Sequence, residues 1–327
     1  VKIMTTYKEI RGTNIEVLAS DPSNPVLGQV WYNSTSNVVK GFSNNPGSWS
    51  TSGALNTARL ALAGSGYGTQ SAALGFGGYN GPPGTAPRLT ELYDGSTWTE
   101  VNDLGTGRYR LAGAGTSTSA LAIGGQPSEK ALNESWNGSN WTEVGDLNTG
   151  RSRFGAAGTS NTSALAFGGG PPDTAVTELW NGSNWTEVND LGTARYSQNG
   201  GVGIATAALY IGGNVPGPGA NSGKTESWNG TNWTEVNDLN TARRYLAGTG
   251  HTNTSALASG GNVSPSGQTE TWNGTNWSET GDLNDGRQNL AGAGTSTSSV
   301  VFGGSPSYKN TTEEFNSGPI TVTFTDS

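Results

Sequence analysis

The sequence has no cysteine, one histidine and one methionine in 327 residues. The absence of cysteine excludes a disulfide framework and any thiolate nucleophile. No apolar run approaches the roughly 20 residues that a membrane-spanning helix needs, and the opening residues lack the basic and apolar pattern of a signal peptide. We therefore expect no insertion into a membrane.

Positive charge is also scarce. The 17 basic residues are outnumbered by 25 acidic ones, which gives a formal net charge of -8, and no basic cluster occurs. Recognition of a phosphate backbone depends on clustered Lys and Arg side chains, so we expect no nucleic-acid partner. Helical periodicity is absent as well, whereas 52 glycines punctuate the chain. Together these features indicate an all-β protein.

What the sequence does contain is a repeat. One copy, residues 226–261, reads ESWNGTNWTEVNDLNTARRYLAGTGHTNTSALASGG, and related copies begin at Glu91, Glu134, Glu178, Glu270 and Glu313. A period of about forty-five residues is typical of circular or stacked arrays. A residue that recurs in every copy is most simply explained by the fold, so a specific function should lie where the copies differ.

Each copy contains a hairpin signal. In the copy just quoted, Trp228 and Trp233 flank an Asn-Gly pair, which favours a tight turn between two strands because both residues tolerate positive φ. This spacing predicts that the two indole rings face each other across the hairpin. The same pairing is predicted for the other copies: Tyr93 with Trp98, Trp136 with Trp141, Trp180 with Trp185, Trp272 with Trp277 and, in the last copy, Phe315 with Ile320.

Each copy also contains an apolar strand that ends in a double glycine, with an aromatic residue and a Trp following at short spacing. This pattern resembles the kelch repeat. The double glycines are Gly77-Gly78, Gly124-Gly125, Gly168-Gly169, Gly212-Gly213, Gly260-Gly261 and Gly303-Gly304. The kelch family builds β-propellers in which each repeat forms one blade, so the resemblance, which covers residues 52–325, implies an all-β, kelch-like β-propeller with six blades. It is silent on function, because propellers serve both as binding scaffolds and as enzymes.

The first fifty residues depart from the repeat. Residues 28–51 are predicted to form a three-strand meander, and they resemble a short module of tailed-bacteriophage tail and fibre proteins, Gly-x-x-Trp-Tyr-Asn followed by a strand and a Ser-Trp. The meander is expected either to supply a closing strand of the ring, with Trp49 inside it, or to form a degenerate seventh blade. We accordingly divide the chain into a docking and linker segment (1–27), the meander (28–51) and the kelch-like propeller (52–327).

Enzymatic functions of propellers find little support in the residues. A kelch-type copper oxidase requires a Cys crosslinked to a Tyr and two His ligands, whereas the single histidine here, His251, stands in a turn where other copies have Thr and is expected to be solvated. The run from Asp94 to Trp98 is one residue short of the Asp box of sialidase-like propellers. The sequence therefore predicts a protein that is not an enzyme and that needs no metal or other cofactor.

Five copies place an Asp five residues before an Arg: Asp103 and Arg108, Asp146 and Arg151, Asp190 and Arg195, Asp238 and Arg243, Asp282 and Arg287. Guanidinium groups around a ring would be suited to an anion-binding crown. A packing role explains the recurrence better, with Asp and Arg satisfying backbone groups and each other where blades meet.

The copies differ most in the loop between the double glycine and the next Glu. These loops are rich in Pro and Gly, and binding residues are typically found in loops held by a rigid scaffold. The candidate binding residues in them are Tyr79, Arg88, Lys130, Lys224, Tyr308 and Lys309. Unconstrained drift of the loops is the alternative explanation.

A second variable set follows the recurring Arg directly and includes Tyr109-Arg110, Ser152-Arg153, Tyr196 and Arg244-Tyr245. Aromatic and guanidinium groups near the ring entrance would stack on sugar rings or meet acidic glycans, which makes Tyr109 and Tyr245 further candidates. Packing between blades explains this set equally well.

These observations predict a non-enzymatic structural or attachment protein of a tailed phage, located on the virion surface as a tail, fibre or capsid-surface component. Its partners would be other virion proteins, bound through the N-terminal segment, and a glycan or protein of the host surface. Homo-oligomerisation stays open. The alternative is a secreted or surface-anchored bacterial adhesin or interaction scaffold, in which the same loops would serve at the cell surface.

Overall fold

Strands and turns make up all of the structure that the computed structural model describes, which covers residues 15–81, 86–128, 130–216, 221–264 and 266–324. No helix in these ranges is long and apolar enough to cross a membrane. The chain divides into two compact units, one spanning Gly47–Asn316 and the other combining Val1–Pro46 with Ser317–Ser327. The all-β class expected from the sequence is confirmed.

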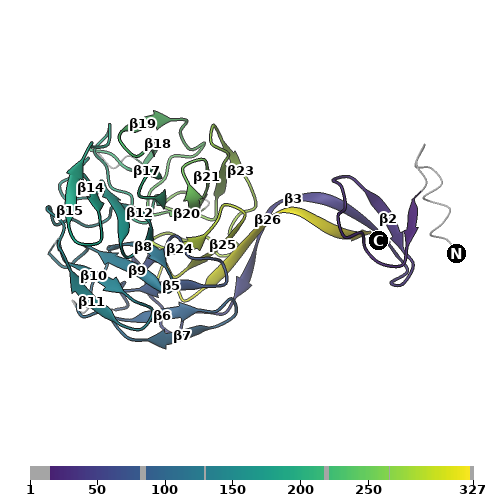
Figure 1. Ribbon diagram of the computed structural model, residues 1–327, viewed down its shortest axis with the longest axis horizontal. Helices are drawn as coiled ribbons and strands as arrows, with labels where there is room; N and C mark the ends of the chain where they lie inside the picture. Colours follow the sequence, from purple (N-terminus) through teal and green to yellow (C-terminus); the bar gives the residue numbers. More distant parts are fainter. Residues whose placement is uncertain (1–14, 82–85, 129, 217–220, 265, 325–327) are drawn as a thin grey trace. The chain divides into compact units, whose positions relative to one another are not determined.

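The larger unit is a β-propeller, and its described strands form six blades (Figure 1). Blade 1 consists of β4 (Ala63–Gly64), β5 (Ala73–Phe76), β6 (Thr90–Tyr93) and β7 (Trp98–Val101), and blade 2 of β8 (Ala112–Thr116), β9 (Ser119–Ile123), β10 (Asn133–Trp136) and β11 (Trp141–Val144). Blade 3 consists of β12 (Gly155–Ser160), β13 (Ser163–Phe167), β14 (Thr177–Trp180) and β15 (Trp185–Val188), and blade 4 of β16 (Gly201–Ile204), β17 (Ala207–Asn214), β18 (Asn221–Trp228) and β19 (Trp233–Val236). Blade 5 consists of β20 (Ala247–Thr252), β21 (Ser255–Ser259), β22 (Thr269–Trp272) and β23 (Trp277–Glu279), and blade 6 of β24 (Ala291–Gly294), β25 (Ser298–Phe302), β26 (Thr312–Phe324) and β3 (Val38–Ser52). The six blades favoured by the repeat are thus confirmed.

The Asn-Gly turns form the hairpins that the sequence predicts. Gly230 has a φ of 94°, and Asn229 Oδ1 accepts hydrogen bonds of 2.9 Å from the amides of Thr231 and Asn232. The turn therefore places Trp228 directly opposite Trp233, with ring centroids 5.4 Å apart. The same register is found for Tyr93 with Trp98, Trp136 with Trp141, Trp180 with Trp185 and Trp272 with Trp277.

The outer-strand indoles also link neighbouring blades. Trp233 Nε1 of blade 4 donates to Thr177 Oγ1 of blade 3 over 3.0 Å. Equivalent bonds join Trp98 to Thr312, Trp141 to Thr90, Trp277 to Thr225 and Trp49 to Thr269. Each of these threonines stands directly before the recurring Glu. The repeat thereby supplies both partners of a bond that ties one blade to the next.

The junction between blades 2 and 3 departs from this rule. The position before Glu134 is occupied by Asn133 instead of Thr. Asn133 Nδ2 donates to Gly145 O over 2.9 Å, while its Oδ1 and Trp185 Nε1 are buried without a hydrogen-bond partner among the described residues. This junction therefore buries two unsatisfied polar atoms, each of which lowers stability.

An N-terminal strand closes the ring. The strand order of blade 6 is β24-β25-β26-β3, so its outer strand comes from the other end of the chain. Trp49 is buried, its indole lies 5.1 Å from the Phe315 ring, and its Nε1 donates to Thr269 Oγ1. The closing-strand alternative is therefore correct. The pairing predicted between Phe315 and Ile320 is wrong, because β26 continues straight past Phe315 and leaves Ile320 42% exposed.

Small residues let the inner strands meet at the ring axis. A Cβ added to Gly113 would lie 2.1 Å from Gly64 O of the neighbouring blade, closer than any side chain tolerates. In blade 4 five residues separate the recurring Arg from the inner strand, whereas in the other blades three residues do. In this insertion Gln198 is buried, and Asn199 Nδ2 donates to Leu62 O of blade 1 and Leu290 O of blade 6. These side chains plug the channel.

The space left along the axis is too small for a ligand. Two cavities lined mainly by the inner-strand glycines and alanines measure about 10 and 20 Å³. Such volumes suffice for a single water molecule. Neither cavity has room for a ligand larger than a water molecule.

The smaller unit contains β1 (Glu16–Leu18), β2 (Val30–Asn33) and the parts of β3 and β26 that lie outside Gly47–Asn316. β1 pairs with β2 in parallel, and β2 pairs with β3 in antiparallel orientation. The Asp21 carboxylate accepts hydrogen bonds from Lys40 Nζ, Asn33 Nδ2 and Trp31 Nε1 over 2.7, 2.7 and 3.1 Å. These bonds, led by that of Lys40, lower the pKa of Asp21 to about 2.

The smaller unit also carries large apolar side chains at its surface. Val17, Val26, Leu27, Ile320 and Phe324 are between 42% and 67% exposed. The boundaries of the two units fall after Pro46 and after Asn316, and so differ from the division into 1–27, 28–51 and 52–327 made from the sequence. The C-terminal residues belong to the same unit as the N-terminal segment because β26 extends beyond Asn316, where blade 6 ends.

Replacing Asn133 by Thr should stabilise the protein. A Thr hydroxyl at this position would accept the Trp185 Nε1 hydrogen bond and would remove the unpaired Asn133 Oδ1, which we expect to raise the free energy of unfolding by about 1 kcal/mol. The matched exchange, Thr177→Asn, should lower it by a similar amount. Denaturant unfolding of the two variants measures both changes, and an Asn133→Thr protein less stable than the parent would contradict this view of the junction.

Candidate binding site

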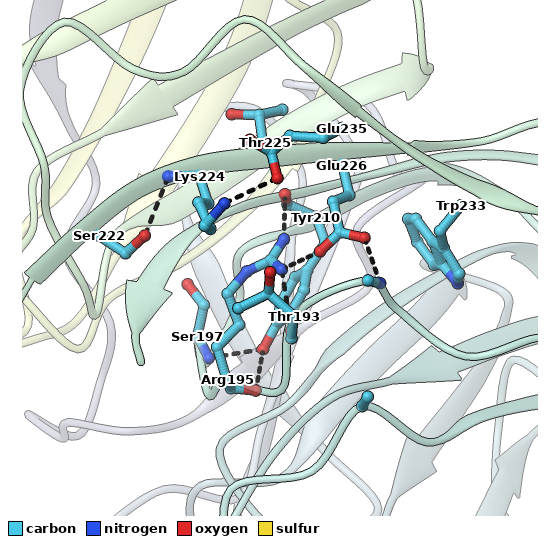
Figure 2. A network of polar contacts seen from close by, with 12 residues as sticks. Thr193, Arg195, Ser197, Tyr210, Ser222, Lys224, Thr225, Glu226, Trp233 and Glu235 are labelled. Carbon is cyan, nitrogen blue, oxygen red and sulfur yellow. Dashed lines mark hydrogen bonds and ion pairs between the residues drawn. The ribbon is translucent and has the colours of Figure 1, made fainter. Parts of the chain in front are cut away.

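Six buried arginines hold the connections between blades, and each forms an ion pair with the recurring Glu (Figure 2). In the example drawn, Arg195 pairs with Glu226 and donates through Nη2 to Tyr210 O over 3.0 Å. Glu226 Oε2 also accepts a 2.6 Å bond from Gly192 N, which lies in the connection from the preceding blade. The other pairs are Arg59 with Glu91, Arg108 with Glu134, Arg151 with Glu178, Arg243 with Glu270 and Arg287 with Glu313.

These arginines cannot act as an anion-binding crown. Their side chains are at most 2% exposed, and the carboxylates that neutralise them at most 3%. Burial lowers the pKa of Arg59, Arg108, Arg151 and Arg243, and the charge of the paired Glu opposes that change. The structural role expected from the sequence is correct.

The partner expected for the arginines is wrong, however. The recurring Asp does not pair with the Arg five residues later. Asp190 Oδ1, for example, accepts a 3.0 Å bond from Thr177 N, and Asp103 Oδ1 accepts the same bond from Thr90 N. The Asp therefore fixes the outer connection to its own blade, while the Glu reaches the Arg from the third strand.

The two variable sets of residues that the sequence singles out meet on one face of the ring. In five of the six copies the residue after the buried Arg forms a β-bridge with the residue after a double glycine: Leu60 with Tyr79, Tyr109 with Gln126, Ser152 with Gly170, Tyr196 with Asn214 and Gln288 with Ser305. In the remaining copy Asn262 N donates to Arg244 O over 2.8 Å. We call the surface formed by these residues and their side-chain neighbours the entrance face. It surrounds the end of the channel that Gln198 and Asn199 close.

Three tyrosines from different blades gather on one side of the entrance face. The Tyr79 ring lies 5.4 Å from the Tyr109 ring and 5.9 Å from the Tyr308 ring, measured between centroids. Tyr308 is 37% exposed, and the other two are half-buried. Tilted rings with accessible edges and faces are suited to stacking against an apolar sugar face.

Guanidinium groups lie on tyrosine rings on the other side of the entrance face. The Arg153 guanidinium lies 5.4 Å from the Tyr196 ring centre, and that of Arg244 lies 5.2 Å from the Tyr245 ring. The rings of Tyr196 and Tyr245 themselves stack at 6.1 Å. Arg110 lies 5.5 Å from the ring of its neighbour Tyr109 and so continues the cluster toward the first three tyrosines. These contacts combine cation–π attraction with a planar aromatic surface.

The backbone directs these side chains to the axis. Arg110, Arg153 and Tyr245 adopt positive φ values of 54°, 58° and 58°. Arg153 N donates to Arg110 O over 2.9 Å, and Arg110 N donates to Ala61 O over 2.8 Å, so that a chain of main-chain bonds passes from blade to blade. The unusual conformation is thereby held by neighbouring blades and not by the local sequence.

Carboxylates are scarce around the three guanidinium groups. Within the described part of the chain Arg110, Arg153 and Arg244 form no ion pair; Arg110 donates to Gln126 Oε1 and Arg244 to Asn214 Oδ1. Burial lowers the pKa of Arg110, and the positive charge of Arg153 lowers it further. The charge of Arg153 also acts on the Asp173 carboxyl group. Burial raises the pKa of Asp173, and the positive charge of Arg153 partly offsets that rise.

The side chains of the remaining candidates make no ring contact or hydrogen bond with this cluster among the described residues. Lys224 pairs with Glu235 over 2.7 Å and Lys309 with Asp285 over 2.9 Å, both in partly exposed ion pairs of small energetic weight. Arg88 is exposed in the segment before β6, and Lys130 is half-buried. The structure thus brings together Tyr79, Tyr109 and Tyr308, and places Tyr245 beside Tyr196.

Sequence reasoning did not commit to Arg110, Arg153, Arg244 or Tyr196 as site residues, although all four stand in the variable set after the recurring Arg. The sequence signal that identifies them is an Arg or a Tyr one or two residues after the recurring, buried Arg. His251, expected to be solvated, is instead half-buried: its ring stacks at 4.1 Å on Tyr67, and its Nε2 lies 3.1 Å from Gly68 O.

Comparison with known proteins finds no family model that matches the chain and no similar curated protein.

Removing the charge of one buried Glu should destabilise the ring strongly. Glu226→Gln leaves the Arg195 guanidinium buried without a counter-ion, and breaking such a pair typically costs about 3–5 kcal/mol. Glu235→Gln, which removes the exposed partner of Lys224, is the control and should cost less than about 1 kcal/mol. Thermal and denaturant unfolding compare the two, and equal stability would show that the buried pair is dispensable.

Proposed function

We propose that this protein is a non-enzymatic attachment protein, whose kelch-like propeller binds a surface ligand through the entrance face. The observation that carries the proposal is the convergence, at the closed end of the channel, of tyrosines and arginines from all six blades. These arginines form no ion pair with any described residue. These residues vary between repeats whose framework positions recur. If these residues served only to pack the blades, the same residue types should recur at these positions in every copy. Their variation therefore favours a binding role.

The chemistry of the entrance face supports binding more than catalysis. Tyr and Arg are the residues most enriched at the energetic centres of binding surfaces, because they combine large contact area with directional hydrogen bonds. Among its described side chains, Asp173 is the single carboxylate near the guanidinium cluster. The described residues contain no group of three or more His, Cys, Asp or Glu side chains placed to hold a metal ion.

The smaller unit supports attachment of the propeller to a larger assembly. Its five exposed apolar side chains lie on strands and turns that no blade needs. Isolated surface apolar residues are common, but a group of this size in a unit of so few residues suits a protein contact. Together with the resemblance of residues 28–51 to tail and fibre modules, this leads us to propose a tailed-phage virion protein that docks on other virion proteins through this unit. Its place would be the virion surface.

Ligand binding should depend on the tyrosines of the entrance face. Tyr109→Ala and Tyr245→Ala remove stacking surface from the two halves of the cluster, and each should weaken adsorption of the purified protein to host cells about tenfold or more. Tyr32→Ala, which changes a tyrosine of the smaller unit, is the control and should adsorb like the parent. Unchanged adsorption of both entrance-face variants would place the ligand elsewhere.

Docking should depend on the N-terminal segment. A chain that starts at Gly28 keeps the ring residues from Gly47 onward but loses β1 and the Asp21 carboxylate that joins β2 to β3. We expect it to keep the β-sheet circular dichroism and the thermal transition of the ring, yet to be missing from assembled particles. Mass spectrometry of purified particles provides the measurement. Normal incorporation would refute the docking role, and recovery of the full chain in cell envelopes without particles would favour an adhesin instead.

A further inference from the structure

We propose that the ligand of the entrance face is an anionic carbohydrate, held by Arg110, Arg153 and Arg244 through its acidic group and by the adjoining tyrosine rings through its sugar face. The inference rests on the proposed function, since it specifies the chemical class of ligand for the same face. It makes the three guanidinium groups anion-binding residues and the tyrosines a stacking surface.

The first argument is the unbalanced charge of the cluster. The six framework arginines each have a carboxylate within 3.2 Å. The three arginines of the entrance face have none within ion-pair distance among the described residues, although the chain as a whole has a net charge of -8. Among the described residues, Asp173 interacts with the charge of Arg153 but forms no ion pair with it. A bound anion would supply the missing negative charge.

The second argument is the unused hydrogen-bonding capacity. Arg153 donates no side-chain hydrogen bond to any described residue, and its Nε is buried without a partner. Arg244 Nε is buried and unpartnered too, while one of its Nη atoms bonds Asn214. A guanidinium carries five donors in a planar fork that matches a carboxylate or phosphate. The buried Nε groups are closed to a ligand, so the donors left for an anion are the Nη groups of Arg153 and the remaining Nη group of Arg244.

The third argument is the fixed geometry of the guanidinium groups. Each lies 5.2–5.5 Å from a tyrosine ring centre, which limits the rotamers of a side chain that is otherwise flexible. Arg110 and Arg153 are also joined through the main chain, so that two like charges are kept as neighbours. Holding like charges together raises the energy of the unliganded cluster. Binding of an anion relieves that repulsion.

The combination with tyrosine favours a sugar over other anions. A pyranose ring presents an apolar face of C–H groups that stacks on an aromatic ring, while its carboxylate or phosphate substituent lies at the edge. The negative charge of the whole protein disfavours a nucleic acid, whose binding relies on neutralising many phosphates along a basic surface. The cluster therefore suits isolated acidic groups spaced along a glycan.

The experiment compares charged and neutral forms of the same sugar polymer. Binding of the full chain to polygalacturonate and to its fully methyl-esterified form, and to a phosphomannan and neutral mannan, is measured by calorimetry at low and at high salt. We expect each acidic polymer to bind at least tenfold more tightly than its neutral counterpart, and binding to weaken with salt. Preference for polygalacturonate identifies a carboxylate ligand and preference for phosphomannan a phosphate ligand.

Variants assign the binding to the cluster. Arg153→Gln and Arg244→Gln, which keep the side chain up to Cδ but remove the charge and the guanidinium donors, should each weaken binding of the acidic polymer by tenfold or more, as expected for loss of a charge-assisted contact. Lys40→Gln, which removes a positive charge from the smaller unit, is the control and should bind like the parent. Circular dichroism and the melting temperature verify that all three remain folded.

The outcomes separate this inference from the proposed function. Equal affinity for esterified and free polygalacturonate and for mannan and phosphomannan, no binding of either acidic polymer at low salt, or tighter binding of a single-stranded oligonucleotide would overturn the anionic glycan. If the Arg variants adsorb to host cells normally while Tyr109→Ala does not, the entrance face is a binding site for a neutral ligand and only this inference fails. If none of these changes affects adsorption, both fail.

Discussion

The buried ion pair between the recurring Arg and Glu is the interaction on which the propeller depends. Each pair joins the connection that enters a blade to the third strand of that blade, and the carboxylate accepts further bonds from connection amides such as Gly192 N. A buried ion pair adds little net stability compared with apolar packing, but an unpaired charge in its place is very unfavourable. The pair therefore permits one arrangement of the connection and penalises the others. Repeated in six copies, it sets the path of the chain from blade to blade.

This constraint also explains where variation is tolerated. The ion pair fixes the position of each Arg, and an inner strand of small residues follows shortly after it. The backbone between these two points therefore has little freedom, whereas its side chains are free to vary. The inner strands that follow require glycine and alanine, because neighbouring strands approach within backbone contact at Gly64 and Gly113. The plug formed by Gln198 and Asn199 closes what space is left. The binding that we propose is accordingly assigned to the entrance face, where Tyr and Arg side chains meet.

Closure of the ring and formation of the smaller unit use the same two strands. β3 supplies the outer strand of blade 6 and also pairs with β2, while β26 forms the third strand of that blade and continues past Asn316. The Trp49 indole, packed on Phe315 and bonded to Thr269, repeats within blade 6 the contacts that an internal hairpin makes elsewhere. The termini are thus part of the ring's stability as well as of its proposed attachment.

The sequence by itself determined the features that depend on near neighbours. The Asn-Gly turn requires positive φ at Gly230 and so fixes the register of Trp228 and Trp233. The six copies of the repeat, each with its double glycine, predicted the blade number. Tertiary structure decided every partner that lies far along the chain. The Arg proved to pair with a Glu some thirty residues away in place of the nearby Asp, and Phe315 packs on Trp49 instead of Ile320. The tyrosines and arginines of the entrance face come together only when the ring closes. They occupy equivalent positions in separate repeats, and the circular arrangement of the blades makes these positions neighbours. No spacing along the sequence shows this.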